Sequence, residues 1–220
     1  MLPKIIVYSA VSVDGRMDWL SVNMGLFYQF IPCWKEEATL VGSHTLLQAP
    51  LEEERETPSE PFEKNPDDPR PLLVVPDSRG RVRNLHVWRK QPYWRDVVAL
   101  CSQKTPKEYF KYLQQQQIES IVAGDDHVDL RAALEEVNSQ YGVNVVRADC
   151  GGTLNGILLR AGLVHEVSVL IHPCLVGGTT PQSLFLAPDL TSSDGIISLK
   201  LIHVEQVKEH ILWLRYEVIT

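Results

Sequence analysis

The chain has 220 residues, which is enough for one large domain or two small ones. Hydrophobic residues make up 44% and charged residues 22%, so collagen-like, coiled-coil and intrinsically disordered proteins are disfavoured. The formal net charge of −7 argues against nucleic-acid binding, because nucleic-acid-binding proteins usually carry a basic face. Any anion that the chain binds must therefore be held by a local cluster of residues.

The four cysteines form no C-x-x-C pair and have no histidine at zinc-finger spacing. We therefore expect free thiols and no metal site. The apolar run that begins at Lys4 is too short for a signal peptide or a membrane span. These features predict a cytoplasmic protein with no membrane partner.

Continuous apolar runs rich in β-branched residues recur along the first two thirds of the chain. They are typical of strands that are buried on both faces, and they lie at residues 4–10, 72–75, 96–100, 118–123 and 143–148. A further short apolar run lies at residues 38–41. Thr105 and Glu108, on either side of Pro106, form a capping-box pattern that predicts a helix to about Gln116. A second helix is predicted over residues 130–141, where apolar residues recur at helical spacing before a glycine. Strands that alternate with helices in this way predict a parallel sheet.

After Gly162 the pattern changes to extended runs with no clear helix between the last two. These runs lie at residues 164–172, 198–206 and 209–219. They predict an antiparallel edge joined to the parallel sheet, in one α/β domain over residues 1–220. Residues 51–70 are rich in Glu, Asp and Pro and predict a solvated surface loop, with a mobile lid or a partner-binding loop as the alternative.

Paired glycines stand between the run at residues 143–148 and a predicted helix. Gly151 and Gly152 would let a phosphate approach the backbone, and the first N–H groups of a helix favour an anion. Thr153 and Asn155 add polar groups to the first turn. The pattern predicts a phosphate-binding turn, and a turn that needs glycine only for its backbone geometry is the alternative.

Charged or polar turns follow three other apolar runs. Ser78 precedes Arg79 and Arg81, whose guanidinium groups suit the 2′-phosphate of NADP, although ordinary surface arginines are the alternative. A short motif that ends at Thr45 follows the run at residues 38–41. Asp14, in an Asp-Gly turn, is structural by default, but it lies at a strand end where open α/β sheets bind ligands.

Taken together, these motifs resemble the dihydrofolate-reductase-like reductase domain of riboflavin biosynthesis, the C-terminal domain of the bifunctional deaminase-reductase. The resemblance spans nearly the whole chain apart from the acidic loop. The motifs that carry it are, in order, Ser12–Arg16 (S-x-D-G-R), Gly42–Thr45 (G-x-x-T), Asp77–Arg79 (D-S-R), Gly151–Asn155 (G-G-T-L-N), Leu158–Glu166 (L-L-R-A-G-L-V-x-E) and Ile171–Gly178 (I-x-P-x-x-V-G-G).

The resemblance implies a three-layer αβα sandwich around a mixed, mainly parallel sheet with a C-terminal antiparallel hairpin. It also implies NADPH as the cofactor and a homodimer. In this family a hydride passes from the nicotinamide to C1′ of a ribosylamino-pyrimidine phosphate and opens the sugar to a ribitylamino product.

The same resemblance assigns roles to residues, except that Arg79 and Arg81 are assigned to the 2′-phosphate on physical grounds. The residues expected to bind the cofactor are Ala10, Gly42, Thr45, Ser78, Arg79, Arg81, Gly151, Gly152, Thr153 and Leu154. The residues expected to face the substrate are Ser12, Asp14 and Asp149, of which Asp14 and Asp149 are the catalytic candidates.

Two departures from the family pattern leave the substrate open. The family's E-G-G-G-T is replaced by Asp149–Thr153, which reads D-C-G-G-T, and the acidic residue that usually follows G-x-x-T is absent from residues 46–50. The alternatives are a reductase of the same fold for another pyrimidine or pterin, such as dihydrofolate, or a non-catalytic NADP-binding module. Dihydrofolate is disfavoured because residues 24–34, the counterpart of the first helix, contain no acid.

Overall fold

The computed structural model describes residues 1–49, 62–65, 67–179 and 182–219. The chain forms two compact units, which are described separately. Unit 1 comprises Met1–Pro3 and Glu36–Val146, and unit 2 comprises Lys4–Lys35 and Arg147–Thr220. No helix among the described residues is long and apolar enough to cross a membrane. The expectation of one domain over residues 1–220 stays a prediction.

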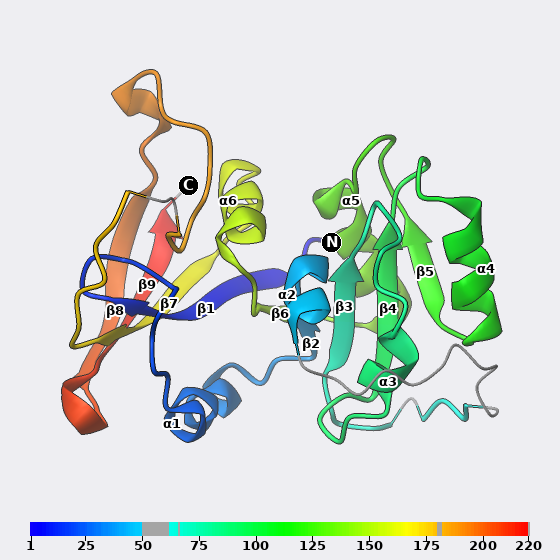
Figure 1. Cartoon of the computed structure of the whole chain (residues 1–220), viewed down its shortest axis with the longest axis horizontal. Helices are drawn as coiled ribbons and strands as arrows, with labels where there is room; N and C mark the ends of the chain where they lie inside the picture. Colours follow the sequence, from blue (N-terminus) through cyan, green and yellow to red (C-terminus); the bar gives the residue numbers. More distant parts are fainter. Residues whose placement is uncertain (50–61, 66, 180–181, 220) are drawn as a thin grey trace. The chain divides into compact units, whose positions relative to one another are not determined.

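Unit 1 is built on parallel strands in the spatial order β5-β4-β3-β2 (Figure 1). Their bounds are β2 (Ala38–Leu40), β3 (Leu72–Pro76), β4 (Asp96–Cys101) and β5 (Glu119–Val122). Val74 of β3 lies between Leu40 of β2 and Val98 of β4, and all three side chains are fully buried. Strands covered on both faces need such continuous apolar sequences, which explains why the sequence predicted them.

Helices cover both faces of this sheet. They are α2 (Ser43–Gln48), α3 (Leu85–Arg89), α4 (Lys107–Gln115) and α5 (Leu130–Tyr141). Leu73 and Val97 pack with α2, α3 and α4 in one core cluster, and the residues that alternate with them along the strands face the opposite side. There α5 packs against β5 and ends at Gly142, whose φ of +67° suits glycine.

Unit 2 combines parallel and antiparallel pairing in the order β1-β7-β9-β8. Its strands are β1 (Lys4–Ser12), β7 (Glu166–His172), β8 (Ser198–Gln206) and β9 (Leu212–Ile219), and β1 pairs with β7 in parallel while β9 pairs antiparallel with β7 and β8. Strand β6 (Val145–Ala148) contains the boundary between the units. The prediction of a mixed sheet with a C-terminal antiparallel hairpin is confirmed.

Two helices lie on opposite sides of β1, namely α1 (Met24–Gln29) and α6 (Gly152–Arg160) (Figure 1). A short 3₁₀ helix, η1 (Ile31–Trp34), follows α1. Tyr8 of β1 stacks on Phe27 at 4.4 Å between ring centroids, and Trp34 completes the group at 5.0 Å from Tyr8. This aromatic cluster holds α1 and η1 against the β1 side of unit 2.

Two local predictions were wrong. The last strand begins at Leu212 and not at residue 209, because residues 208–210 form a 3₁₀ turn in which His210 has a φ of +62°. Thr105 does not cap α4, whose N-cap is Pro106. Its hydroxyl instead accepts a hydrogen bond from the Ser102 N–H at 2.9 Å and donates one to the Ser78 carbonyl at 3.0 Å.

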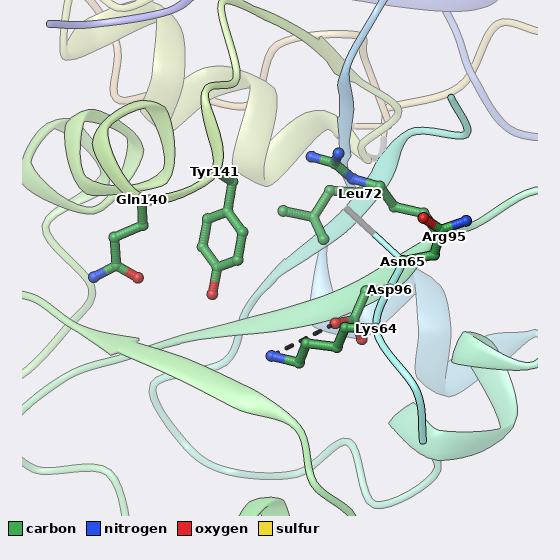
Figure 2. A pocket seen from close by; sticks show the side chains of 7 residues that line it. All are labelled: Lys64, Asn65, Leu72, Arg95, Asp96, Gln140 and Tyr141. Carbon is green, nitrogen blue, oxygen red and sulfur yellow. Dashed lines mark ion pairs between the residues drawn. The ribbon is translucent and has the colours of Figure 1, made fainter. Parts of the chain in front are cut away.

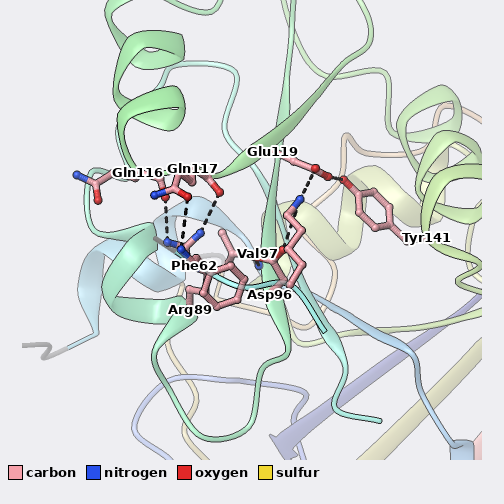
Figure 3. Close-up of polar contacts among 9 residues, drawn as sticks. Phe62, Arg89, Asp96, Val97, Gln116, Gln117, Glu119 and Tyr141 are labelled. Carbon is pink, nitrogen blue, oxygen red and sulfur yellow. Dashed lines mark hydrogen bonds and ion pairs between the residues drawn. The ribbon is translucent and has the colours of Figure 1, made fainter. Parts of the chain in front are cut away.

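Of the acidic loop, residues 51–61 and 66 lie outside the described residues, so its solvated state stays a prediction. The described end of the loop contacts the amino ends of β4 and β5 (Figure 3). Phe62 lies over the Arg89 guanidinium at 4.1 Å, and Lys64 pairs with Glu119 and, at 3.9 Å, with Asp96. Figure 2 shows the adjacent pocket of about 220 Å³, which is lined by Lys64, Asn65, Leu72, Arg95, Asp96, Gln140 and Tyr141.

Candidate functional site

In unit 1 the candidate residues lie where β2 and β3 end. We call Asp77–Arg83, which follows β3, the arginine loop. The buried Asp77 carboxylate accepts backbone hydrogen bonds from Arg81 at 2.6 Å and from Val82 at 2.8 Å. Gly80 has a φ of +62°, and a Cβ there would lie 2.7 Å from the Tyr109 side chain, so the loop needs glycine at this position. Asp77 and Gly80 together fix the backbone of the arginine loop.

This backbone leaves two arginine side chains exposed. Arg79 and Arg81 are both exposed, and Arg81 donates a hydrogen bond to the Ser43 hydroxyl at 3.3 Å. Ser43 is the first residue of α2, so the arginine loop lies beside the predicted Gly42–Thr45 motif, in which Thr45 is exposed. The structure thus brings the G-x-x-T and D-S-R motifs together within unit 1.

Two other polar groups of the arginine loop are used internally. The Ser78 hydroxyl accepts a hydrogen bond from the Val128 N–H at 3.0 Å. Arg83 lies over the rings of Tyr109 and Tyr112, at 5.5 and 5.3 Å from their centroids. Arg79 and Arg81 are therefore the arginines of this loop that can reach a ligand phosphate.

In unit 2, β1 ends in the turn Ser12–Arg16, which we call the first-strand turn. The buried Ser12 hydroxyl donates to an Asp14 carboxylate oxygen at 2.6 Å and accepts from the Arg16 N–H at 2.9 Å. The same carboxylate accepts from the N–H groups of Val176 at 3.2 Å and Gly177 at 2.7 Å. These bonds, above all the one from Ser12, lower the pKa of Asp14 to about 2. Asp14 is thus a permanent carboxylate whose two oxygens both accept hydrogen bonds from its own unit.

Asp149 follows β6 and has a different environment. Its carboxylate is 37% exposed and pairs with the Arg147 guanidinium at 2.9 Å, while the Arg147 side chain is 3% exposed. Burial raises the pKa of the Tyr8 phenol, which also interacts electrostatically with Arg147 and Asp149. The Tyr8 hydroxyl donates a hydrogen bond to the Phe27 carbonyl at 2.7 Å. Asp14 is exposed and Asp149 is partly exposed, so the two catalytic candidates differ in their bonds: both oxygens of Asp14 accept hydrogen bonds from unit 2, whereas Asp149 pairs with Arg147 through one oxygen.

The two glycines of the Gly151–Leu154 motif have different neighbours. Gly151 is exposed, and a Cβ there would have no atom within 4 Å. At Gly152 a Cβ would overlap the Ser183 carbonyl, so this glycine is required by packing. Gly151 is the N-cap of α6 and provides no side-chain cap, so it leaves the first N–H groups of the helix available to an anion.

Asn155, predicted as a polar first-turn group, is fully buried. Its amide nitrogen donates to the carbonyls of Cys150 at 3.1 Å and Leu184 at 3.2 Å. The residue therefore supports the turn at Gly151–Leu154, which we call the glycine turn, from its buried side and cannot contact a ligand. The exposed Thr153 and the half-buried Leu154 stay candidates for cofactor contact, whereas Ala10 is buried within β1.

A pocket of about 450 Å³ lies beside the first-strand turn. It is lined by Arg16, Asp18, Trp19 and residues 174–178. Arg16 pairs with Asp18 through two hydrogen bonds of 3.0 Å, and Trp19 is 89% exposed at the rim. Among the residues that the structure describes, no cluster of His, Cys, Asp or Glu has a metal-binding arrangement, and none of the four cysteines forms a disulfide bond.

Sequence reasoning missed two residues that organise these sites. The turn-capping role of Asp77 was not predicted from the D-S-R motif, although a position directly after a buried strand is typical of a residue that caps a turn. Arg147 was overlooked inside a strand. An arginine in an apolar strand two residues before an aspartate is a usable signal, since residues i and i+2 share a face of a strand.

The sheet, its covering helices and the polar strand ends define a protein of the dihydrofolate-reductase-like α/β class. Residues 3–213 match the model of the RibD C-terminal domain, and the chain belongs to this family. Solved structures agree on the fold. The RibD of Acinetobacter baumannii gives a TM-score of 0.71 at 17% identity over 99% of this chain, which spans 58% of that protein. A pyrimidine reductase-like protein of Corynebacterium diphtheriae gives 0.71 at 16% identity, with 99% and 92% covered.

Two curated reductases are similar to the chain over nearly their full length. A 2,5-diamino-6-ribosylamino-4(3H)-pyrimidinone 5′-phosphate reductase of Methanothermobacter thermautotrophicus is 30% identical over 213 residues, which cover 91% of this chain and 92% of the relative. A reductase of the same name from Archaeoglobus fulgidus is 28% identical over 224 residues, with 94% of both chains covered. The predicted family resemblance is confirmed.

Proposed function

We propose that the chain is an NADPH-dependent reductase of 2,5-diamino-6-ribosylamino-4(3H)-pyrimidinone 5′-phosphate in riboflavin biosynthesis. The observation that carries the proposal is the near full-length similarity to reductases of this name, at 30% identity over 91% of the chain. The polar groups at the strand ends of both units support it, because open α/β sheets bind ligands there.

Each unit, taken by itself, offers groups that suit a charged part of NADPH. Gly151 offers open backbone at the N-terminus of α6, which suits the pyrophosphate. Arg79 and Arg81 offer exposed guanidinium groups, which suit a 2′-phosphate. When bound, NADPH supplies the hydride that reduces C1′ of the substrate.

The protein's own contribution is position and charge. Asp149, oriented by the buried Arg147, would accept hydrogen bonds from amino groups of the pyrimidine. Asp14 stays ionised and bonded within unit 2, so it would shape the site and would not transfer a proton. Asp149 is thus the proposed catalytic carboxylate. Ser12 and Asp14 would instead stabilise the first-strand turn, to which they belong.

We further propose a cytoplasmic homodimer that forms through one face of the β8–β9 hairpin. Leu199, Leu201 and Val204 are 43, 50 and 58% exposed and lie opposite Val218, Tyr216 and Leu214 on one face of the hairpin. Charged residues such as Lys200 and Glu217 alternate with them onto the other face. An exposed apolar face without charges is typical of a homodimer contact. Leu201→Glu should halve the mass measured by light scattering, and an unchanged mass would exclude this face.

The function is tested by the oxidation of NADPH in the presence of the pyrimidinone phosphate, followed by the absorbance of the reduced nicotinamide. We expect turnover with this substrate, loss of most activity in Asp149→Asn, and normal activity in Asp189→Asn, a control at an exposed carboxylate. Turnover of dihydrofolate alone would support the alternative substrate. Thermal stabilisation by NADPH without turnover of either compound would support a non-catalytic binding module.

A further inference from the structure

The connection that follows β7 contacts both candidate motifs of unit 2. Its described parts are residues 173–179 and 182–197, and Figure 1 shows it in yellow to orange after β7. The first contact is made through Asp14, whose carboxylate accepts from the N–H groups of Val176 and Gly177. The Val13 N–H donates to the Cys174 carbonyl at 2.9 Å beside it. Three hydrogen bonds thus join the first-strand turn to the start of this connection.

These bonds also join the two walls of the pocket of about 450 Å³. One wall of the pocket is Arg16, Asp18 and Trp19, just after the first-strand turn, and the other is residues 174–178 of the connection. Asp14 bonds the second wall from its place in the turn that leads into the first. Any ligand in this pocket therefore meets walls that are joined by the Asp14 carboxylate and by the bond from the Val13 N–H to the Cys174 carbonyl.

The residues after the first-strand turn also contact the later part of the connection. The Met17 N–H donates to the Gln182 carbonyl at 3.1 Å, and Arg16 and Ser183 form an isolated antiparallel β-bridge. Residues 174–177 and residues 182–183 are therefore both bonded to residues 13–17.

From Ser183 onward the connection packs against the glycine turn and α6. The Leu186 N–H donates to the Gly152 carbonyl at 2.9 Å, and Asn155 bonds the Leu184 and Cys150 carbonyls together. A Cβ at Gly156 would overlap the Leu186 carbonyl, as one at Gly152 would overlap Ser183. The two glycines of α6 are therefore needed for the close passage of the connection.

We propose that Asp14 and Asn155 are positioning residues that couple the first-strand turn to the glycine turn through the β7–β8 connection. The inference rests on the proposed function, since it gives these motifs a common task of aligning substrate and cofactor. Asp14 bonds the start of the connection through the N–H groups of Val176 and Gly177, and Asn155 joins a later part of it to the glycine turn by bonding the Leu184 and Cys150 carbonyls. The hydride donor and acceptor react only when held in alignment, so a loosened connection lowers kcat more than it raises KM.

Asn155 acts in this coupling as a donor. Its amide oxygen is buried without a hydrogen-bond partner among the described residues, while its nitrogen makes both bonds. The matched changes are therefore Asn155→Leu, which keeps the branched shape and removes the donors, and Asp14→Asn, which replaces one acceptor oxygen by a donor. Asp189→Asn, at an exposed site on the same connection, is the control.

The first experiment measures amide hydrogen exchange on the ligand-free protein, so it does not depend on the reaction. In Asp14→Asn we expect about tenfold faster exchange at residues 174–178, and faster exchange also at residues 184–186 and 150–156. In Asn155→Leu we expect faster amide exchange in the same three segments. Faster exchange confined to residues 174–178 in Asp14→Asn would overturn the coupling. If Asn155→Leu does not fold, the result for Asp14→Asn alone tests the proposal.

The second experiment is a double-mutant cycle on kcat. Each single change should lower kcat about tenfold with less than about threefold change in KM, and the double variant should lose little more than either single variant. Additive losses would mean independent motifs and would overturn the proposal. If the wild type shows no turnover, the proposed function fails, and the exchange experiment still tests the coupling.

Discussion

The arginine loop of unit 1 and the first-strand turn of unit 2 are both charged turns at a strand end, yet they use their charges in opposite ways. In the arginine loop a buried carboxylate, Asp77, bonds the backbone and leaves Arg79 and Arg81 exposed. In the first-strand turn the exposed carboxylate, Asp14, is fully bonded, and the cation beside it, Arg16, is buried and paired with Asp18.

The difference separates binding from positioning. A charged side chain that is exposed and makes few bonds within its own unit can bind a ligand with little loss of existing contacts, whereas a carboxylate whose two oxygens both accept hydrogen bonds within its unit mainly shapes what surrounds it. The arginine loop is accordingly suited to contact the cofactor, and the first-strand turn is suited to set geometry. The predictions below test this division in order of expected effect.

The largest effect is expected from Asp77→Ala, which removes the group that holds the arginine loop. The backbone N–H groups of Arg81 and Val82 lose a charged acceptor that is itself buried, so the free energy of unfolding should fall by about 3 kcal/mol. The affinity for NADPH should fall with it, because Arg79 and Arg81 lose their fixed backbone. Urea denaturation and a cofactor titration measure both, with Asp189→Ala as the control. Stability within about 0.5 kcal/mol of the wild type would remove Asp77 from this role.

The next effect is expected from two alanine substitutions that look alike in the sequence. Gly156→Ala should lower the free energy of unfolding by about 2 kcal/mol, since its Cβ overlaps the Leu186 carbonyl. Gly151→Ala meets open space and should change stability by less than about 0.5 kcal/mol while weakening NADPH binding. Thermal or chemical denaturation of the pair decides. Equal stability losses would contradict the separation of a packing glycine from a binding glycine.

A smaller effect is expected when Arg79 and Arg81 both become alanine. The side chains are exposed, so stability should hold, while affinity for NADPH should fall about tenfold, or 1.4 kcal/mol, with little change for NADH. Fluorescence titration with both cofactors measures the ratio, and Lys111→Ala serves as a control at an exposed cation of α4. Equal affinity of the wild type for NADPH and NADH would refute this assignment.

The smallest effect is expected from pH at Asp14. Its pKa of about 2 lies below the usual value, so the carboxylate is charged at all higher pH and loses its charge only as the pH falls through about 2. The ratio of kcat between the wild type and Asp14→Asn should therefore stay constant from about pH 5 to pH 9. A ratio that bends within this range would show that Asp14 exchanges a proton during the reaction.

The regular part of the fold was predictable because its signals are local. β3, β4 and α5 lie where apolar runs and helical spacing predicted them. Covered strands and amphipathic helices need apolar residues at short, regular spacings, so their burial can be predicted from neighbouring residues. Helix α3 was missed because its five residues are too short to show a period. The start of β9 was misplaced because the 3₁₀ turn before it carries no breaker residue that marks its end.

The candidate site was predictable in its motifs but not in their division of labour. Nothing near Asp14 reveals that its partners lie at Val176 and Gly177, and nothing near Gly156 reveals Leu186. Such contacts join residues far apart in the sequence, so single-sequence patterns do not contain them. The sequence indicated which turns matter, and the structure separates the residues that can touch a ligand from those that hold the turns.

The most direct test of the central claim follows the hydride itself. The protein is incubated with the pyrimidinone phosphate and NADPH deuterated at the transferred position, and the product is examined by mass spectrometry and NMR. The account predicts a ribitylamino product with one deuterium at C1′. With Asp149→Asn it predicts that most of this product is lost. A product without deuterium, or deuterium recovered only in a reduced pterin, would contradict the account.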